Sequence, residues 1–459
     1  MNPSTRCRPA PARSSEDNRS IIEQTLLRTR ERTVLLTDAV DEQDLIRQHS
    51  PLMSPLVWDL AHIGNQEELW LVRDVGGRAP VRQDIDELYD AFKHPRVDRP
   101  SLPLLSPVQA RGYVGEVRDK VWDVLAAAAL DGRGLGRASG GPHRSWVTEA
   151  FMFGLIVQHE QQHDETMLAT HQLRAGGPVL QAPSPPTPAA GVRAQEVRIP
   201  AGRFSMGTSS DPWALDNERP GHAVHVAGFA MDRYPVTNAD YARFVAAGGY
   251  RQPRWWSVGG WRHRRSADLA APQFWTADGD WWLRRVFGTT TPLVPDEPVV
   301  HVSFYEAEAY AAWSGKRLPT EWEWEKAARY DPLSGSARRN PWGEHDATPA
   351  QANLGQRHLR PARIGAYPAG ASALGVEQLL GDVWEWTSSD FHGYPGFTVM
   401  PYADYSAPFF GGDYKVLRGG SFGTDSAAVS GTFRNWDHPI RRQIFAGFRC
   451  ARDLRPEEA

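Results

Sequence analysis

The chain has 459 residues, a length that predicts two or three domains. Its 51 lysine and arginine residues nearly balance 55 acidic ones, and the charge of −4 argues against a nucleic-acid partner, which usually requires a basic face. No apolar run approaches the ~20 residues of a membrane span, and the polar N-terminus lacks the apolar core of a secretory signal, so we expect no membrane partner. The two cysteines, Cys7 and Cys450, exclude a disulfide framework and favour a cytoplasmic location.

The first part of the chain has the pattern of a helical bundle. Residues 1–18 are rich in proline, arginine and serine, and we expect a disordered tail there. Apolar residues at helical spacing predict a helical domain over residues 19–174. Its helices are expected at about residues 20–48, 54–74, 108–129 and 146–173. Ser54 can cap the second helix, with Pro55 at the first helical position. The simplest arrangement is an all-α four-helix bundle.

The second part of the chain has a different texture. Residues 175–195 contain five prolines and are predicted to be a linker. Residues 196–455 combine short apolar runs with many turn residues, and fourteen of the 18 tryptophans lie in this part. Helices are expected there at residues 238–247, 303–314 and 320–330. We therefore predict a mixed α+β domain held together by aromatic packing.

A metal site is predicted in the helix that contains VQHEQQHDETML. His159 and His163 are four residues apart, so both rings project from one helix face, a separation that suits one metal ion. The apolar residues on that face indicate that it points inward. His171 departs from this face and is expected at the surface. His62, on the second predicted helix, can reach the pair because packed helices lie ~8–10 Å apart.

Three alternatives remain open at this point. HEQQH also matches the H-E-x-x-H pattern of zinc hydrolases, with Glu160 as general base. Glu67 is an alternative third ligand and would give a site of two histidines and one carboxylate for iron. A third possibility is a binding module without catalytic activity. Metal content and oxygen consumption distinguish these hypotheses.

Several motifs resemble those of a known family. The segments PLMSPLVWDLAHIG and HEQQHDETML resemble the DinB-like helical domain of the ergothioneine-biosynthesis sulfoxide synthases, the EgtB family. The second half resembles the formylglycine-generating-enzyme-like, or C-type-lectin-like, domain of that family. Its motifs here include RLPTEWEWEKAAR, GDVWEWTSS, VLRGGSF and FRNWDHPIRRQIFAGFR. The first two are shared across a wider superfamily, whereas the last, with the helical-domain histidines, is far more specific.

The resemblance implies a non-haem iron(II) enzyme with O2 as co-substrate. Such an enzyme joins a thiol sulfur to the imidazole C2 of hercynine and oxidises the product to a sulfoxide. The implied iron ligands are His62, His159 and His163. Neutral imidazoles suit iron(II), and three protein ligands leave positions open for substrates and O2.

The same resemblance assigns roles to residues of the second domain. Tyr402 is the implied catalytic acid that favours C–S bond formation over thiol oxidation, and Tyr405 is the alternative. Asp437 and Arg441 are expected to hold the charged ends of the thiol substrate. Candidates for contacts to hercynine are Gln162, Asn435 and Trp436, the last through cation–π attraction to the trimethylammonium group.

The identity of the thiol substrate rests on one further pair. Arg96 and Arg99 match two arginines that bind the γ-glutamyl carboxylate in members using γ-glutamylcysteine, and a planar guanidinium suits that role. We therefore expect γ-glutamylcysteine to be the thiol donor. Free cysteine remains the alternative donor. Formylglycine-generating enzymes carry a copper-binding cysteine pair after the RGGS turn, but RGGSFGTDSAAVSG has none. The second domain is therefore expected to bind substrates at an active site between the two halves.

Overall fold

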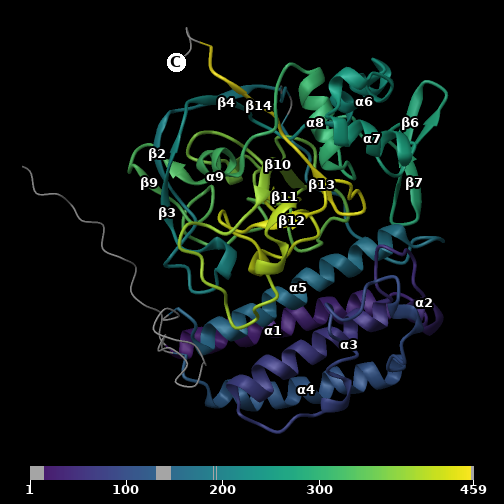
Figure 1. The fold of residues 1–459 in the computed structure, drawn as a ribbon, viewed down its shortest axis with the longest axis vertical. Helices are drawn as coiled ribbons and strands as arrows, with labels where there is room; N and C mark the ends of the chain where they lie inside the picture. The colour runs from purple at the N-terminus through teal and green to yellow at the C-terminus, as the bar shows by residue number, and fades with distance from the viewer. Residues whose placement is uncertain (1–14, 131–145, 190, 193, 456–459) are drawn as a thin grey trace, which may run out of the picture.

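The computed structural model describes residues 15–130, 146–189, 191–192 and 194–455 of the chain. A helical bundle lies against a second domain of short strands and helices (Figure 1). This arrangement confirms the predicted fold class. Most of the predicted tail, residues 1–14, lies outside the described residues, and the first helix begins at Ser15, before the predicted domain boundary.

The described part of the helical domain contains four long helices and one short helix. Their bounds are α1 Ser15–Asp38, α2 Glu42–Ile46, α3 Leu56–Glu67, α4 Pro107–Ala127 and α5 Glu149–Leu173. The single helix predicted over residues 20–48 is therefore two. The break occurs because Asp41 caps a new helix, its side chain accepting a hydrogen bond from the backbone N–H of Asp44. After α3 the chain continues directly into a π-helical segment, Glu68–Val75.

The start of α3 differs from the prediction. Pro55 occupies the N-cap position and Leu56 is the first helical residue. The Ser54 hydroxyl, predicted as the cap, instead accepts a 2.6 Å hydrogen bond from Arg99. The side chain thus ties a loop to the bundle, a contact that local sequence does not reveal.

Helix α5 forms the boundary between the two domains. In Figure 1 it runs along the base of the second domain, with α1, α3 and α4 on its other side. Its buried residues occur on all faces, as expected for a helix enclosed by protein. His171, predicted to be at the surface, is buried, with Nε2 2.8 Å from the carbonyl oxygen of Leu36. That prediction was wrong because α1 covers this face of α5.

A buried ionic network holds the bundle together. Arg30 and Arg118 each contact both Glu67 and Glu160, at N–O distances of 2.5 to 3.0 Å. The hydroxyl of Thr33 donates a further 2.7 Å hydrogen bond to Glu160. Two carboxylates and two guanidinium groups therefore balance each other inside the bundle, as buried charges require.

The second domain contains several small sheets and four helices in its described part. One three-stranded sheet contains, in spatial order, β1 Glu196–Ile199, β4 Phe229–Asp232 and β14 Ala451–Asp453. The four-stranded sheet contains, in spatial order, β12 Asn435–Asp437, β11 Gly411–Arg418, β10 Trp384–Phe391 and β13 Ala446–Gly447. The remaining strands are β2 Gly202–Met206, β3 His222–Val226, β5 Trp275–Asp278, β6 Trp281–Val286, β7 Thr289–Pro292, β8 Tyr330–Asp331 and β9 Ser336–Ala337. The helices are α6 Asn238–Ala246, α7 Val258–Ser266, α8 Phe304–Trp313 and α9 Glu321–Arg329. Antiparallel pairing with β11 fixes β12, with Trp436 opposite Val416.

Aromatic side chains build the interior of this domain, as predicted. Trp324 and Trp386, from two of the superfamily motifs, are fully buried. The indole N–H of Trp324 donates to Glu385, and that of Trp386 donates to the carbonyl of Val302. Buried apolar side chains form one continuous cluster through both domains. The second domain is thus a rigid support packed onto the bundle.

Glu165 of α5 is a central polar contact between the domains. Its buried carboxylate accepts hydrogen bonds from the Trp384 indole, the Ser421 hydroxyl and the Thr424 hydroxyl, at 2.8, 2.5 and 2.6 Å. Ser421 and Thr424 belong to the RGGS segment that lacks the copper-binding cysteines. In this protein, that segment is therefore a docking surface for α5.

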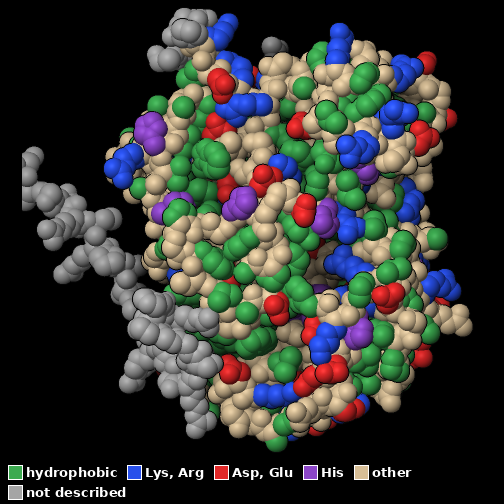
Figure 2. Space-filling model, viewed as in Figure 1, with side chains coloured by type: hydrophobic (Ala, Val, Ile, Leu, Met, Phe, Trp, Pro, Cys, Tyr) green, Lys and Arg blue, Asp and Glu red, His purple; other side chains and the backbone are tan. Residues whose placement is uncertain are grey.

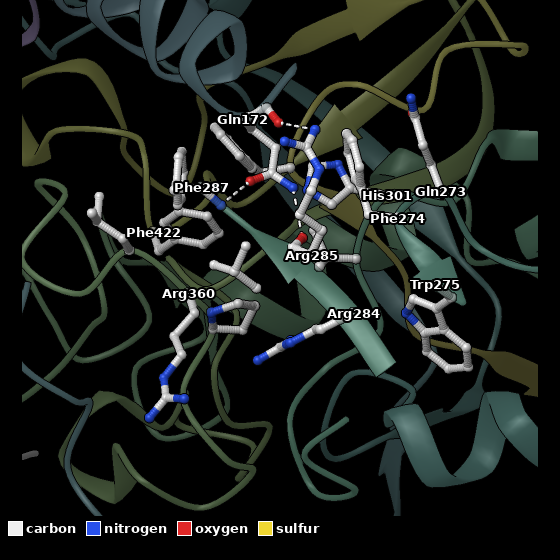
Figure 3. A pocket seen from close by; sticks show the side chains of 15 residues that line it. Gln172, Gln273, Phe274, Trp275, Arg284, Arg285, Phe287, His301, Arg360 and Phe422 are labelled. Atoms are coloured by element: carbon white, nitrogen blue, oxygen red, sulfur yellow. Dashed lines mark hydrogen bonds between the residues drawn. The ribbon is translucent and has the colours of Figure 1, made fainter. Parts of the chain in front are cut away.

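The C-terminal end of α5 is held in a similar way. Figure 3 shows the Gln172 amide bonded to the backbone of the second domain: its oxygen accepts from the N–H of Phe287 and its nitrogen donates to the carbonyl of Arg285. The cavity beside Gln172 has a volume of about 20 Å³, which is only enough for a water molecule. This cavity is therefore too small to hold a substrate.

The surface carries charges of both signs. On the face shown in Figure 2, acidic and basic side chains are interspersed over both domains, in keeping with the small net charge. Among the described residues, no helix combines the length and the apolar character needed to cross a bilayer.

Candidate metal centre and active site

Three histidines from two helices meet inside the bundle. His62 lies on α3, and His159 and His163 lie one turn apart on α5. Each offers a ring nitrogen, and these atoms lie within 4.8 Å of one another. The Nε2 atoms of His62 and His159 are 3.3 Å apart. The structure therefore brings together the three residues that the sequence predicted as metal ligands.

Hydrogen bonds on the far side of the rings orient two of these histidines. His62 Nδ1 lies 2.7 Å from the carbonyl oxygen of Tyr89, which fixes Nδ1 as the protonated nitrogen and leaves Nε2 as a lone-pair donor. His163 Nδ1 lies 3.1 Å from a carboxylate oxygen of the buried Asp59. Such partners are typical of histidines that bind metals. Neither partner was predicted, because each lies far in sequence from the histidine that it orients.

The electrostatic environment favours the neutral form of two of these histidines. Burial, together with the proximity of the other two histidines, lowers the pKa of His62 well below its usual value. Burial and the neighbouring His163 likewise lower the pKa of His159. Two buried neutral imidazoles whose Nε2 atoms lie 3.3 Å apart match the needs of a divalent metal ion. The residues present therefore fit a metal ion.

The geometry does not support the two alternative ligand schemes. Glu160 is fully buried, and its carboxylate is bonded to Arg30, Arg118 and Thr33 rather than directed to the histidine cluster. It is thus not positioned as the general base of a hydrolase. Glu67 is bound by the same two arginines. His62, and not Glu67, completes the group of three.

A tyrosine from the second domain approaches the cluster. The ring of Tyr402 lies 6.2 Å from the ring of His159 and 5.8 Å from that of Trp70, measured between centroids. Burial raises the pKa of Tyr402 to about 12, so its phenol stays protonated near neutral pH. Tyr405 lies farther along the same loop, and its hydroxyl donates a 3.0 Å hydrogen bond to the Gln162 side chain. Of the two tyrosines, Tyr402 contacts a predicted metal ligand.

The predicted hercynine contacts surround this tyrosine pair. Gln162, adjacent to His163, has a buried side-chain nitrogen without a hydrogen-bond partner among the described residues. Trp436 stands perpendicular to Tyr405, with ring centroids 5.7 Å apart, and stacks on Phe391 at 4.2 Å. Asn435 accepts a hydrogen bond from the backbone N–H of Trp436. The structure thus gathers Gln162 and Trp436 around Tyr405, and Asn435 adjoins Trp436 on β12.

The predicted thiol-substrate residues divide into two groups. Asp437 and Arg441 form an ion pair with an N–O distance of 3.5 Å. Burial raises the pKa of Asp437, and the positive charges of Arg441 and of Arg96, which belongs to the first domain, oppose this shift. The three residues make a charged site that spans both domains.

Arg99 has a different environment. It is buried, and its three guanidinium nitrogens donate to the His94 carbonyl, the Ala91 carbonyl and the Ser54 hydroxyl. Its Cζ lies 3.5 Å from the ring centroid of Trp58, which in turn stacks on His62 at 4.7 Å. Arg99 thus contacts Trp58, the residue that packs against the predicted metal ligand His62. Its role in binding a substrate carboxylate stays a prediction.

Two family models together match most of the chain. A model of the DinB superfamily matches residues 25–167, and a model of the sulfatase-modifying factor enzyme 1-like domain matches residues 182–454. The formylglycine-generating enzyme of Streptomyces coelicolor is 35% identical over 60% of this chain and 96% of its own length. That similarity is confined to part of this chain.

Other relatives match both domains together. The hercynine oxygenase of Mycolicibacterium smegmatis is 51% identical over 95% of this chain and 99% of its own length. The hercynine oxygenase of Mycobacterium tuberculosis is 52% identical over 94% of this chain and 98% of its own length. These matches show that the chain belongs to the hercynine oxygenase family, oxidoreductases of ergothioneine biosynthesis.

Proposed function

We propose that this protein is an iron(II)- and O2-dependent sulfoxide synthase that joins the sulfur of γ-glutamylcysteine to the imidazole C2 of hercynine. The product is γ-glutamyl-hercynylcysteine sulfoxide. One oxygen atom of O2 enters the sulfoxide, and the other leaves as water with the hydrogens of the C–H and S–H groups. The observation that carries this proposal is the three-histidine cluster beside Tyr402 at the domain boundary.

His62, His159 and His163 would hold the iron, since neutral imidazoles suit iron(II). Bound there, iron(II) supplies the redox chemistry that lets O2 act as the oxidant. Asp59 and the Tyr89 carbonyl keep two of the rings in their ligating orientation.

Tyr402 has the properties of the catalytic acid. Its phenol is protonated, because burial raises its pKa to about 12, and its ring adjoins His159. A proton held at the Tyr402 hydroxyl is available when the reaction generates basic oxygen, which favours C–S bond formation over oxidation of the thiol alone. Tyr405 instead uses its hydroxyl to orient Gln162.

The other polar groups would position the two substrates. The unpaired side-chain nitrogen of Gln162 can donate to hercynine, with Trp436 and Asn435 nearby. The charged site of Arg96, Asp437 and Arg441 suits the two carboxylates and the ammonium group of γ-glutamylcysteine. Free cysteine, with a single carboxylate, uses fewer of these groups and remains the second candidate. We also propose a cytoplasmic location.

The test is anaerobic loading with iron(II), followed by measurement of O2 uptake and products with hercynine and both thiols in competition. We expect uptake that needs iron, hercynine and a thiol together, with the γ-glutamylcysteine adduct as the main product. A preference for cysteine would reassign the thiol donor. Hydrolysis with zinc and no O2 uptake would refute the proposal.

Removal of a ligand gives a second test. His159→Ala is expected to abolish both iron binding and turnover, as measured by metal analysis and product formation. His171→Gln, on the same helix but outside the cluster, should retain iron. Unchanged iron content in His159→Ala would overturn the three-histidine site.

A further inference from the structure

A second cavity lies between the domains, away from the histidine cluster. Its volume is about 400 Å³. One wall is α1, with Arg28, Glu31 and Arg32, and the opposite wall is formed by Arg357 and Asp425 of the second domain. Both domains therefore contribute charged side chains to one space that is large enough for a small metabolite.

The cavity lies on a different side of α5 from the metal site. Gln161 of α5 lines it, and that residue is two positions from each of His159 and His163. Two positions on an α-helix correspond to a rotation of about 200°. A ligand in this cavity would therefore lie apart from the histidine cluster.

Among the described residues, the arginines of this cavity form no close ion pair, and Asp164 and Asp425 act on Arg32 only from a longer distance. Among the described residues, no carboxylate lies within 4.0 Å of the guanidinium nitrogens of Arg28, Arg32 or Arg357, whereas most buried arginines of this protein are paired. Arg32 is half-buried, and one of its nitrogens donates to the carbonyl of Gly355 at 3.2 Å. Arg357 donates to the carbonyls of Leu354 and Ala352. Arg32 and Arg357 are partly buried cations with unused donors and provide a site for an external oxyanion, whereas Arg28 lies at the exposed edge of the cavity.

The acidic residues of the cavity restrict the ligand further. Glu31 and Asp425 line it together with the three arginines, which leaves one excess positive charge. A complementary ligand carries groups of both signs and one excess negative charge. An amino acid with two carboxylates and one ammonium group has this charge pattern at neutral pH.

We infer that this interdomain cavity binds a small amino dicarboxylate, with its carboxylates at Arg32 and Arg357 and its ammonium group at Asp425. The ligand would contact both domains, so its binding adds to the contacts that hold them together. The segment that carries Asp425 also contains Thr424, which donates to Glu165 of α5. Occupancy therefore stabilises the docked arrangement.

The experiment is calorimetric titration of the full chain with L-glutamate, and with glutarate as the analogue without the ammonium group. We expect L-glutamate to bind and to raise the melting temperature, and glutarate to bind at least about tenfold more weakly. Arg32→Gln should weaken L-glutamate binding by at least about tenfold. Arg357→Gln is the second variant, in case Arg32→Gln does not fold, and the same loss is expected.

Two controls locate the binding. Asp425→Asn should remove the preference for L-glutamate over glutarate, since it deletes the charge that faces the ammonium group. Arg441→Gln, which alters the catalytic cleft, should leave L-glutamate binding unchanged. The inference is overturned if L-glutamate does not bind, if glutarate binds equally well, or if Arg441→Gln and not Arg32→Gln abolishes binding.

Discussion

His62 is held by a segment of the chain that begins 27 residues after it, at Tyr89. The Tyr89 carbonyl fixes the far nitrogen of the ring, and Trp58 stacks on its face. Arg99 closes this support, since its guanidinium lies against Trp58 and donates to two carbonyls of the same segment. At the residue scale, the orientation of one predicted iron ligand therefore depends on a buried arginine.

Replacement of Arg99 by leucine tests this support. Because three hydrogen bonds and a cation–π contact are lost, we expect the free energy of unfolding to fall by about 3 kcal/mol and iron affinity to fall by about tenfold or more. Urea denaturation and iron titration measure these effects. Arg96→Leu, on the same loop but partly exposed, should change stability little and raise KM for the thiol. If Arg99→Leu raises only that KM, Arg99 is a substrate-binding residue, as the sequence predicted.

Tyr402→Phe separates proton donation from packing. The ring contacts with Trp70 and His159 remain, and only the protonated hydroxyl is lost. We expect iron binding to persist, the C–S product to fall by about 100-fold, and O2 to oxidise the thiol to a sulfinate instead. Product analysis by mass spectrometry measures the ratio. Tyr405→Phe is the matched control, and a sulfinate from that variant alone would assign the acid role to Tyr405.

At the element scale, α5 presents a different chemistry on each face. His159 and His163 point to the metal site, whereas Glu160 points to the buried arginines. Gly154 and Glu165 meet the second domain, where Gly154 lies directly under Trp213. A side chain added at this glycine would place its Cβ 2.7 Å from the indole ring. The glycine therefore permits the close approach of the two domains.

Two glycine-to-alanine substitutions test this close approach. Gly154→Ala should lower the free energy of unfolding by about 1–2 kcal/mol, because overpacking against Trp213 outweighs the better helix propensity of alanine. Gly115 lies on the exposed side of α4, and a Cβ added there meets no atom within 4 Å. Gly115→Ala should therefore raise the free energy of unfolding by up to about 1 kcal/mol. Urea denaturation of both variants measures the difference. Equal stabilisation by both would show that the domains do not pack tightly at this point.

At the scale of the whole molecule, the proposed active site exists only when the two domains are docked. The bundle contributes the histidines, and the second domain contributes Tyr402, Trp436 and the Asp437–Arg441 pair. Glu165, two positions after His163 on α5, joins the domains through three hydrogen bonds. The docking contact and the catalytic geometry are thus coupled through α5.

Glu165→Ala is expected to weaken the docking of the domains. The substitution leaves Trp384, Ser421 and Thr424 without their acceptor, and we expect a loss of about 3 kcal/mol in the free energy of unfolding. Hydrogen exchange should increase along the face of α5 that meets the second domain. Glu165→Gln retains an acceptor oxygen, so its free energy of unfolding should fall by less than that of Glu165→Ala. Unchanged exchange in Glu165→Ala would show that apolar packing alone holds the domains.

The sequence by itself determined the broad organisation of this protein. The change in composition near residue 175 separates two domains, and the spacing of His159 and His163 predicts two of the three proposed metal ligands, because helical periodicity is a local property. Local pattern could not decide whether His62 or Glu67 is the third member of the cluster. It also could not show that α1 buries His171. Those outcomes depend on contacts between residues far apart in the chain, such as the 97 positions that separate His62 from His159. Periodicity identifies which face of a helix is buried, but only the tertiary structure supplies the partner that covers it.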